Sequence, residues 1–391
     1  MAVLVLLVAA AGWLQRQPGG PALVFALCAG TVLGVALQRS RFCFYCHARD
    51  WAERRDPRGL LAILLAITVG IVGYTVVLGG WMPVPSAGRL PPDIHIGPVS
   101  WVLVAAGLAF GAGMVVSGSC ISAHWYRLAE GSAASPFALV GAAAGFGLGF
   151  LTWNPLYSLA VADAPVVWLP AHLGYGGALA LQLAVLAALA AWLWTRQGPA
   201  APSAEPSASA APVDRRLSAV LARAVTGRWP YWTGGLLVGL VVVATVLRMR
   251  PLGVTTTLGS TTRAVLSAEG WVPPRLEGLD GFAGCATLPG AAWLTPHAAL
   301  LAGLVAGAFA ASFAAAQFRP RRPTGRDVGR GLVGGVLLGW GAMTGLGCTV
   351  GTLLSGTAAG ALSGWVFGAA LFAAVFGGLA LQAAVRRRAA G

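Results

Sequence analysis

A series of long apolar runs constrains the fold of this chain more than any other feature. Several runs approach the roughly 20 residues that an α-helix needs to cross a bilayer. Because an unpaired backbone polar group is costly in hydrocarbon, such runs fold as spanning helices. They lie at about 2–14, 21–37, 60–79, 100–117, 136–152, 176–195, 231–247, 298–316, 331–346 and 361–382. The sequence therefore predicts an all-α integral membrane protein with about nine to ten transmembrane helices, of which the first is short enough to be a partial span.

The composition agrees with a membrane environment. Hydrophobic residues make up 57% of the chain and charged residues only 10%, whereas about a quarter of the residues of a soluble domain are charged. The 55 glycines predict helices whose backbones approach closely. The formal charge of +14 does not indicate nucleic-acid binding, because the arginines stand in short loops beside apolar runs, where anionic lipid attracts them.

The arginines also orient the predicted bundle. The loops at 39–58 and 319–330 are rich in arginine, whereas 153–175 has none. Basic loops stay on the cytoplasmic side, so both termini are expected to be cytoplasmic, in a bacterial inner membrane. The Pro/Ala/Ser-rich stretch "QGPAAPSAEPSASAAPV" cannot form a core and separates two halves. The expected divisions are an extra apolar segment at 1–20, a first half at 21–195, a cytoplasmic linker at 196–228 and a second half at 229–391.

The two halves resemble each other around one cysteine each. The span that ends in "GAGMVVSGSC" at Cys120 is followed by a short polar stretch, and the span that ends in "GWGAMTGLGC" at Cys348 is followed by another. Each stretch is too short and polar to cross, which predicts a re-entrant loop with a half helix. The two spans are expected to run in opposite directions, so the halves are predicted to be inverted pseudo-symmetric repeats. Transporters place substrate sites at such broken helices, whose N-termini attract anions.

Four stretches resemble one known family, the YeeE/YedE-like membrane proteins, whose characterised members import thiosulfate. They are "QRSRFCFYCHARD" at 38–50, "GAGMVVSGSCISAHWYRLAEGS" at 111–132, "PLGVT" at 251–255 and "GAMTGLGCTVGTLLSGTAAGALSGW" at 341–365. The resemblance implies a thiosulfate path lined by Cys43, Cys120 and Cys348. A thiol is a weak donor that can hold a soft sulfur anion without trapping it, and conduction needs such weak binding.

Other residues near these motifs are candidates for a supporting role. Arg127 and Glu130 lie three apart on the predicted half helix and are expected to pair with each other, since a charge at membrane depth needs a partner. His124 is the histidine expected nearest to Cys120. The full supporting set is Arg41, Arg49, Gly118, Ser119, Ser122, His124, Arg127, Glu130, Gly347 and Thr349.

The loop "RFCFYCHARD" allows other chemistries. Cys43, Cys46 and His47 form a C-x-x-C-H haem pattern, but the charge rule places the loop inside the cell. They offer only three of the four ligands that zinc prefers. A redox role is more plausible, because neighbouring arginines favour thiolates. Cys46 and His47 depart from the family pattern and are possible redox residues. No metal or other cofactor is expected.

The remaining cysteines carry no predicted role. Cys28 lies inside an apolar run and is expected to be a small buried hydrophobic residue, and Cys285 is unassigned. A disulfide framework is not expected, because most cysteines lie in or beside spans.

These observations predict a transporter rather than an enzyme, taking up a small sulfur anion, in the first place thiosulfate. No ATP-binding loop is present in the sequence, which argues against primary pumping by this chain. One alternative is a membrane sulfur-transfer protein that uses Cys43 and Cys46 and hands sulfur to a small cytoplasmic acceptor protein. Another is a transporter of a different sulfur or selenium compound.

Overall fold

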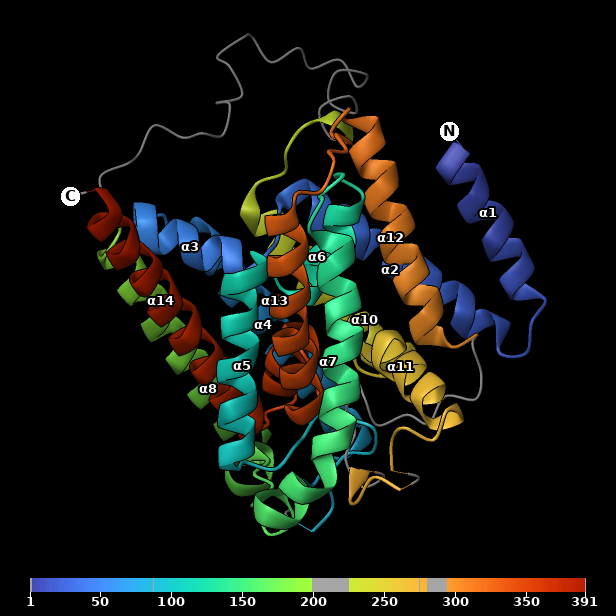
Figure 1. The fold of residues 1–391 in the computed structure, drawn as a ribbon. Helices are drawn as coiled ribbons and strands as arrows, with labels where there is room; N and C mark the ends of the chain where they lie inside the picture. The colour runs from blue at the N-terminus through green and yellow to red at the C-terminus, as the bar shows by residue number, and fades with distance from the viewer. Residues whose placement is uncertain (1, 87, 199–224, 274, 280–293, 391) are drawn as a thin grey trace, which may run out of the picture.

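The computed structural model describes residues 2–86, 88–198, 225–273, 275–279 and 294–390, and these residues are mostly helical (Figure 1). Most of the predicted linker and Cys285 lie outside the described residues. The helices are α1 (Ala2–Gln15), α2 (Gly20–Ser40), α3 (Phe44–Arg54), α4 (Arg58–Trp81), α5 (Trp101–Ser117), α6 (Ile121–Leu128), α7 (Ser135–Leu156), the π-helical η1 (Tyr157–Val161), α8 (Leu169–Thr195), α10 (Tyr231–Arg248), α11 (Thr256–Ala268), α12 (Pro296–Ala314), α13 (Gly325–Thr344), the π-helical η3 (Thr349–Gly356) and α14 (Leu362–Ala390).

Nine helical segments of the described chain are long and apolar enough to cross a membrane. They contain α2, α4, α5, α7, α8, α10, α12, α13 and α14. Helix α1 is apolar but only 14 residues long, shorter than the bilayer requires. The predicted all-α integral membrane fold is confirmed, and the first apolar run forms the expected short helix.

The spanning helices pack in pairs that repeat between the two halves. Helix α2 packs on α12 and α10 on α4, while α13 packs on α7 and α14 on α5. Helices α5 and α13, and likewise α2 and α10, pack on each other. The repeat relates α2 to α10, α4 to α12, α5 to α13 and α7 to α14. Exchanging each helix with its counterpart leaves this set of contacts unchanged. Helices α5 and α13 run in opposite directions (Figure 1), as an inverted repeat requires.

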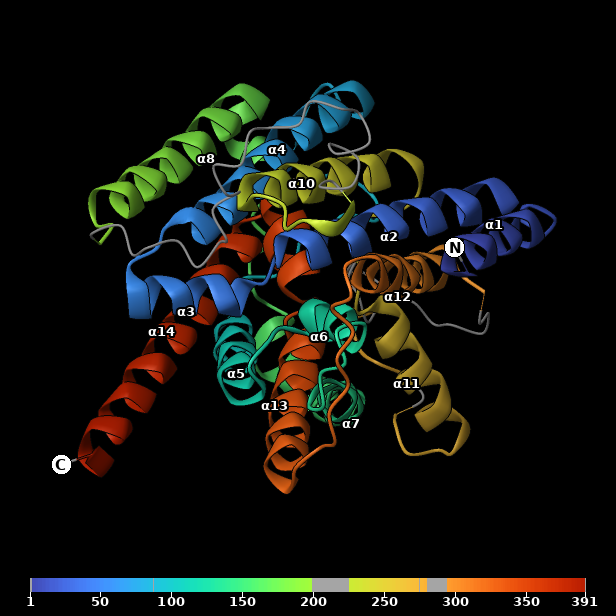
Figure 2. The same ribbon diagram turned by 90° about the horizontal axis from the view of Figure 1, so that it is seen from above.

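One end of the bundle holds the arginine-rich loops. Both termini lie toward this end in Figure 1, and the Arg319 N–H donates a hydrogen bond to the Glu130 carbonyl at 3.2 Å, which joins the 319–330 loop to the turn after α6. Helices α3 and α6 lie at the same end (Figures 1 and 2). We refer to it as the arginine-rich end.

Glycine allows the helix pairs to approach as closely as they do. A Cβ atom at Gly30 or Gly34 of α2 would collide with the carbonyl oxygen of Leu300 or Leu304 on α12. The same holds in reverse for Gly303, whose Cβ would collide with the backbone of α2. Because lipid supplies no hydrophobic drive between helices, this backbone contact is a main source of packing energy.

We expect Gly34→Ala to destabilise the protein by about 1–3 kcal/mol, because the added methyl group overpacks a backbone contact. The thermal unfolding midpoint in detergent is the measurement. The matched control is Gly329→Ala in α13, where a Cβ would meet nothing within 4 Å. Equal midpoints for the Gly34 variant and the unmodified protein would contradict the packing argument.

Candidate functional site

Three cysteines occupy the same structural position at the start of three short helices. Cys43 directly precedes α3, Cys120 precedes α6 and Cys348 precedes η3, and each has an extended backbone. The chain reaches Cys120 through Gly118, whose φ of 84° ends α5 in the left-handed conformation that favours glycine. The two predicted half helices are therefore present, and α3 is a third helix of the same kind.

Helix α3 replaces a predicted loop. The stretch after Cys43 has a helical repeat of buried residues that includes Phe44, Ala48 and Trp51, and this spacing places them on one face. Because charged and polar residues stand between them in the sequence, the helix was not predicted.

The packing brings the three cysteines together. The Cys43 thiol lies close enough to the thiols of Cys120 and Cys46 to interact with both. Cys348 lies close enough to Cys120 for an electrostatic interaction. Cys43, Cys120 and Cys348 are 0%, 1% and 0% exposed, and the structure records them as thiols rather than disulfides. We call these three residues the cysteine cluster, and it is sealed from solvent.

A small cavity lies against the cluster at the interface of the halves. Cys120 and Ser122 line it together with Phe42 and Phe44, which flank Cys43. Leu252, Val350 and Leu354 from the second half close the other side. We call it the central cavity.

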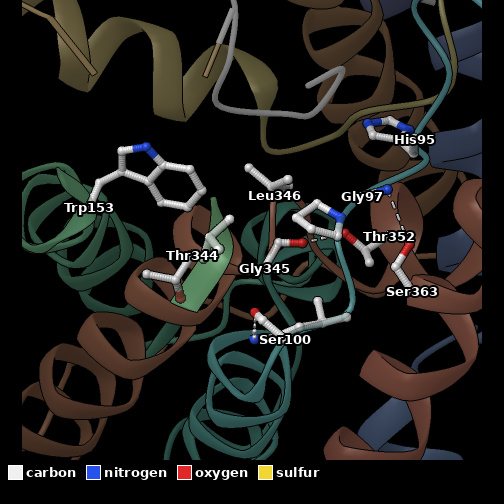
Figure 3. A pocket seen from close by; sticks show the side chains of 12 residues that line it. His95, Gly97, Ser100, Trp153, Thr344, Gly345, Leu346, Thr352 and Ser363 are labelled. Atoms are coloured by element: carbon white, nitrogen blue, oxygen red, sulfur yellow. Dashed lines mark hydrogen bonds between the residues drawn. The ribbon is translucent and has the colours of Figure 1, made fainter. Parts of the chain in front are cut away.

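A second pocket is lined by Ser100, which precedes α5, and by Trp153 near the end of α7 (Figure 3). These ends of α5 and α7 lie away from the arginine-rich end in Figure 1. Leu346 and Thr352 line this distal pocket with His95, Trp153 and Ser363. The Thr352 hydroxyl donates to the Gly345 carbonyl at 2.9 Å, and Ser363 Oγ accepts from the Gly97 N–H at 3.2 Å. Since Thr352 lines the distal pocket while Val350 and Leu354 line the central cavity, the segment that begins at Cys348 separates the two spaces.

His95 gives the distal pocket a polar but neutral wall at physiological pH. Burial and then the neighbouring His297 lower the pKa of the His95 imidazole to about 4. Desolvation disfavours the charged form of a histidine. The pocket therefore carries no histidine charge from His95 at pH 7.

Arg127 brings a positive charge to the other side of the cluster. Its guanidinium donates to Ser119 Oγ at 2.6 Å and to the Gly118 carbonyl at 3.2 Å. A third donor reaches Cys46 Sγ at 3.9 Å. The guanidinium also lies close enough to Cys43 for an electrostatic interaction with its thiol. Arg127 therefore connects the turn before Cys120 to Cys46 of α3.

The expected pairing of Arg127 with Glu130 is not what the structure shows. Glu130 accepts from Gln38 Nε2 at 3.3 Å and lies 3.9 Å from Arg228. Helix α6 ends at Leu128, so Glu130 stands in the turn beyond it, where the helical spacing no longer holds the two side chains on one face.

Several supporting candidates surround the cluster with polar groups. His124 Nδ1 lies 3.1 Å from Ser135 Oγ. The buried hydroxyls of Ser122 and Thr349 have no hydrogen-bond partner among the described residues. A Cβ at Gly347 would approach the Thr352 hydroxyl at 2.6 Å, so glycine permits the tight turn into Cys348.

Other candidates lie outside the cluster. Arg41 is exposed and ends α2 with a φ of 51°. Arg49 lies 3.5 Å from Asp50 and is 41% exposed. His47 is buried against the rings of Tyr231 and Phe42. The structure therefore joins Cys46 to the cluster but places His47 in an aromatic contact.

The prediction for Cys28 was wrong. Its side chain is exposed on α2, where the protein would face lipid. An apolar residue in a spanning helix suits either lipid or the protein interior, so sequence alone does not distinguish the two.

Sequence reasoning did not assign the distal pocket. Among the residues that the structure describes, no group of three His, Cys, Asp or Glu side chains is arranged to hold a metal ion.

Comparison with known proteins agrees with the resemblance in the motifs. Residues 39–377 match the family described as Sulphur transport. The thiosulfate transporter TsuA of Escherichia coli (strain K12) is 34% identical over 114 residues, a match that covers 29% of this chain and 30% of TsuA. Because the family match includes all three cysteines of the cluster and most of the chain, this membrane protein belongs to the Sulphur transport family.

Proposed function

We propose that this protein takes up thiosulfate along the line Cys348, Cys120, Cys43. The observation that carries the proposal is that three buried cysteines, each directly before a separate short helix, lie close enough to interact, Cys43 with Cys120 and Cys120 with Cys348. A purely structural use of cysteine gives no reason for all three to precede a helix. A passage for a soft anion explains this position, because each helix N-terminus presents N–H groups and a partial positive charge to the anion.

The surroundings of the cluster suit a divalent sulfur oxyanion. Thiols are weak donors that suit the polarizable terminal sulfur. The partnerless hydroxyls of Ser122 and Thr349 are available to the oxygens. Arg127 supplies a fixed positive charge beside Cys46, toward the arginine-rich end.

The proposed direction follows from the charge distribution. If the arginine-rich end is cytoplasmic, in a bacterial inner membrane, the distal pocket opens on the outer side and thiosulfate enters there. It then passes the segment at Cys348, the central cavity and Cys43. Since the cluster is sealed from solvent, passage requires the short helices or their side chains to move.

The contact between Cys43 and Cys46 also favours a second candidate, sulfur transfer. In that reaction the Cys43 thiolate attacks the outer sulfur of thiosulfate, the sulfur–sulfur bond breaks, and sulfite leaves with the electron pair. The thiolate of a small cytoplasmic acceptor protein then attacks the persulfide, and Cys43 leaves as a thiolate.

Uptake of labelled thiosulfate by proteoliposomes separates the two candidates. The outer and inner sulfur atoms are labelled in separate preparations. Transport of the intact ion predicts that both labels enter at the same rate, without an acceptor protein. Sulfur transfer predicts that the outer sulfur stays on the protein while the inner sulfur remains outside as sulfite.

Competition defines the substrate. Excess unlabelled thiosulfate should suppress uptake more strongly than sulfate, sulfite or selenite, because only thiosulfate combines a terminal sulfur with three oxygens. If sulfite or selenite competes better, the protein carries another sulfur or selenium compound. Protein-free liposomes are the control, and absence of uptake of either label would refute thiosulfate transport.

A further inference from the structure

A fourth short helix follows a buried segment, as the three helices after the cysteines do, although the residue before it, Thr255, has a helical backbone rather than the extended backbone of the cysteines. Helix α11 directly follows Thr255, just as α3 follows Cys43. The stretch before it, Pro251 to Thr255, is buried throughout. It follows α10 as the loop with Cys43 follows α2.

The repeat that relates the two halves assigns Thr255 to the place of Cys43. Helix α3 packs on α4 and α14, and α11 packs on α12 and α7, which are the repeat partners of α4 and α14. In Figure 1, α3 lies at the upper left of the bundle and α11 at the lower right, as inversion requires. Exchange of the halves therefore pairs Cys120 with Cys348 and Cys43 with Thr255.

The Thr255 hydroxyl is a buried polar group without a use in the fold. The residue is 0% exposed, and its Oγ1 has no hydrogen-bond partner among the described residues. It does not cap α11. Thr245 is equally buried, but its hydroxyl donates to the Val242 carbonyl at 2.9 Å. Because a buried hydroxyl without a partner is unfavourable, the Thr255 hydroxyl is available to donate to a ligand.

The segment with Thr255 also reaches the space beside the cluster. Leu252 lines the central cavity with Cys120. Its carbonyl accepts a hydrogen bond from Ser355 Oγ of η3 at 3.4 Å. The segment is thus fastened to the short helix that Cys348 begins.

We propose that Thr255 is the fourth residue of the anion path and donates its hydroxyl to an oxygen of the sulfur oxyanion beside Cys348. The proposal rests on the proposed function. The repeat pairs Cys43 with Thr255 and Cys120 with Cys348. The interaction of Cys43 with Cys120 in the first half therefore corresponds to an interaction of Thr255 with Cys348 in the second. The anion then meets a hydroxyl first, on the side of the distal pocket, and thiols afterwards. A hydroxyl suits the hard oxygens, whereas the thiols suit the soft sulfur.

Thiosulfate uptake by Thr255→Val and Thr255→Ser proteoliposomes tests this role. The valine variant has nearly the same shape without the hydroxyl, and we expect its uptake to fall about tenfold, as for loss of a hydrogen bond to an ion. The serine variant should stay close to the unmodified protein. Thr245→Val is the matched control, because its hydroxyl serves only its own helix, and it should transport normally.

A second readout does not depend on transport. Thiosulfate that binds the folded protein raises its unfolding midpoint in detergent. Thr255→Val should need about tenfold more thiosulfate for the same rise, with an unchanged midpoint in its absence. If the valine variant does not fold, Thr255→Ala and Thr255→Ser give the same comparison, since they differ only in the hydroxyl.

The outcomes are distinct. A folded Thr255→Val protein that binds and transports thiosulfate normally overturns the role of Thr255. If the unmodified protein neither transports nor binds thiosulfate, the proposed function fails, and with it the role of Thr255. Normal binding with slow uptake in Thr255→Val also contradicts the proposal, because the contact should act on binding.

Discussion

Cys120→Ala and Cys348→Ala should each lower thiosulfate uptake roughly tenfold to a hundredfold, because each removes a donor from the middle of the path and leaves the anion without a partner there. Cys43→Ala should have a similar effect, since Cys43 contacts both Cys120 and Cys46. Initial uptake rates in proteoliposomes with equal amounts of folded protein are the measurement.

Two further variants identify the source of the loss. Cys28→Ala is the matched control, because Cys28 is exposed on α2 and away from the cluster, and it should transport normally. Cys120→Ser keeps a donor but replaces the soft sulfur with oxygen, so its rate should lie between those of the alanine variant and the unmodified protein. Unchanged uptake in both Cys120→Ala and Cys348→Ala would refute the cysteine path.

The spanning helices could be predicted from the sequence because the bilayer sets their length. The apolar run at 100–117 matches α5, and the run at 136–152 lies within α7. Hydrophobicity does not indicate which face of each helix contacts lipid and which contacts other helices. Cys28 is exposed and Cys120 is buried, yet both lie in or beside apolar runs.

The site could be predicted only in part, because its members come from distant segments. The repeat of a glycine-rich span and a cysteine indicated Cys120 and Cys348, and family resemblance added Cys43. That Cys43 contacts Cys120 depends on how α3 and α6 pack, which no local pattern encodes. The partners of Glu130 likewise depend on where α6 ends, and helix ends are poorly defined in sequence.

Arg127→Met should lower thiosulfate uptake by an amount comparable to the loss of a cysteine, roughly tenfold to a hundredfold, because it removes the charge beside Cys46 and two hydrogen bonds to the turn before Cys120. Methionine keeps a long apolar side chain. Arg127→Lys restores the charge but not the planar fork that reaches Gly118 and Ser119 together, so it separates the two contributions.

The lysine variant decides what Arg127 does. If the charge attracts the anion, Arg127→Lys should recover most of the affinity for thiosulfate, read as the concentration that half-saturates uptake. If the fork holds the turn before Cys120, the lysine variant should unfold at a lower temperature and transport slowly at any concentration. Arg58→Gln is the control, because Arg58 pairs with Asp56 at 2.8 Å and is 47% exposed. Normal uptake by Arg127→Met would show that the anion passes Cys43 without help from this charge, and the exit toward the arginine-rich end would then depend on thiols and helix N-termini alone.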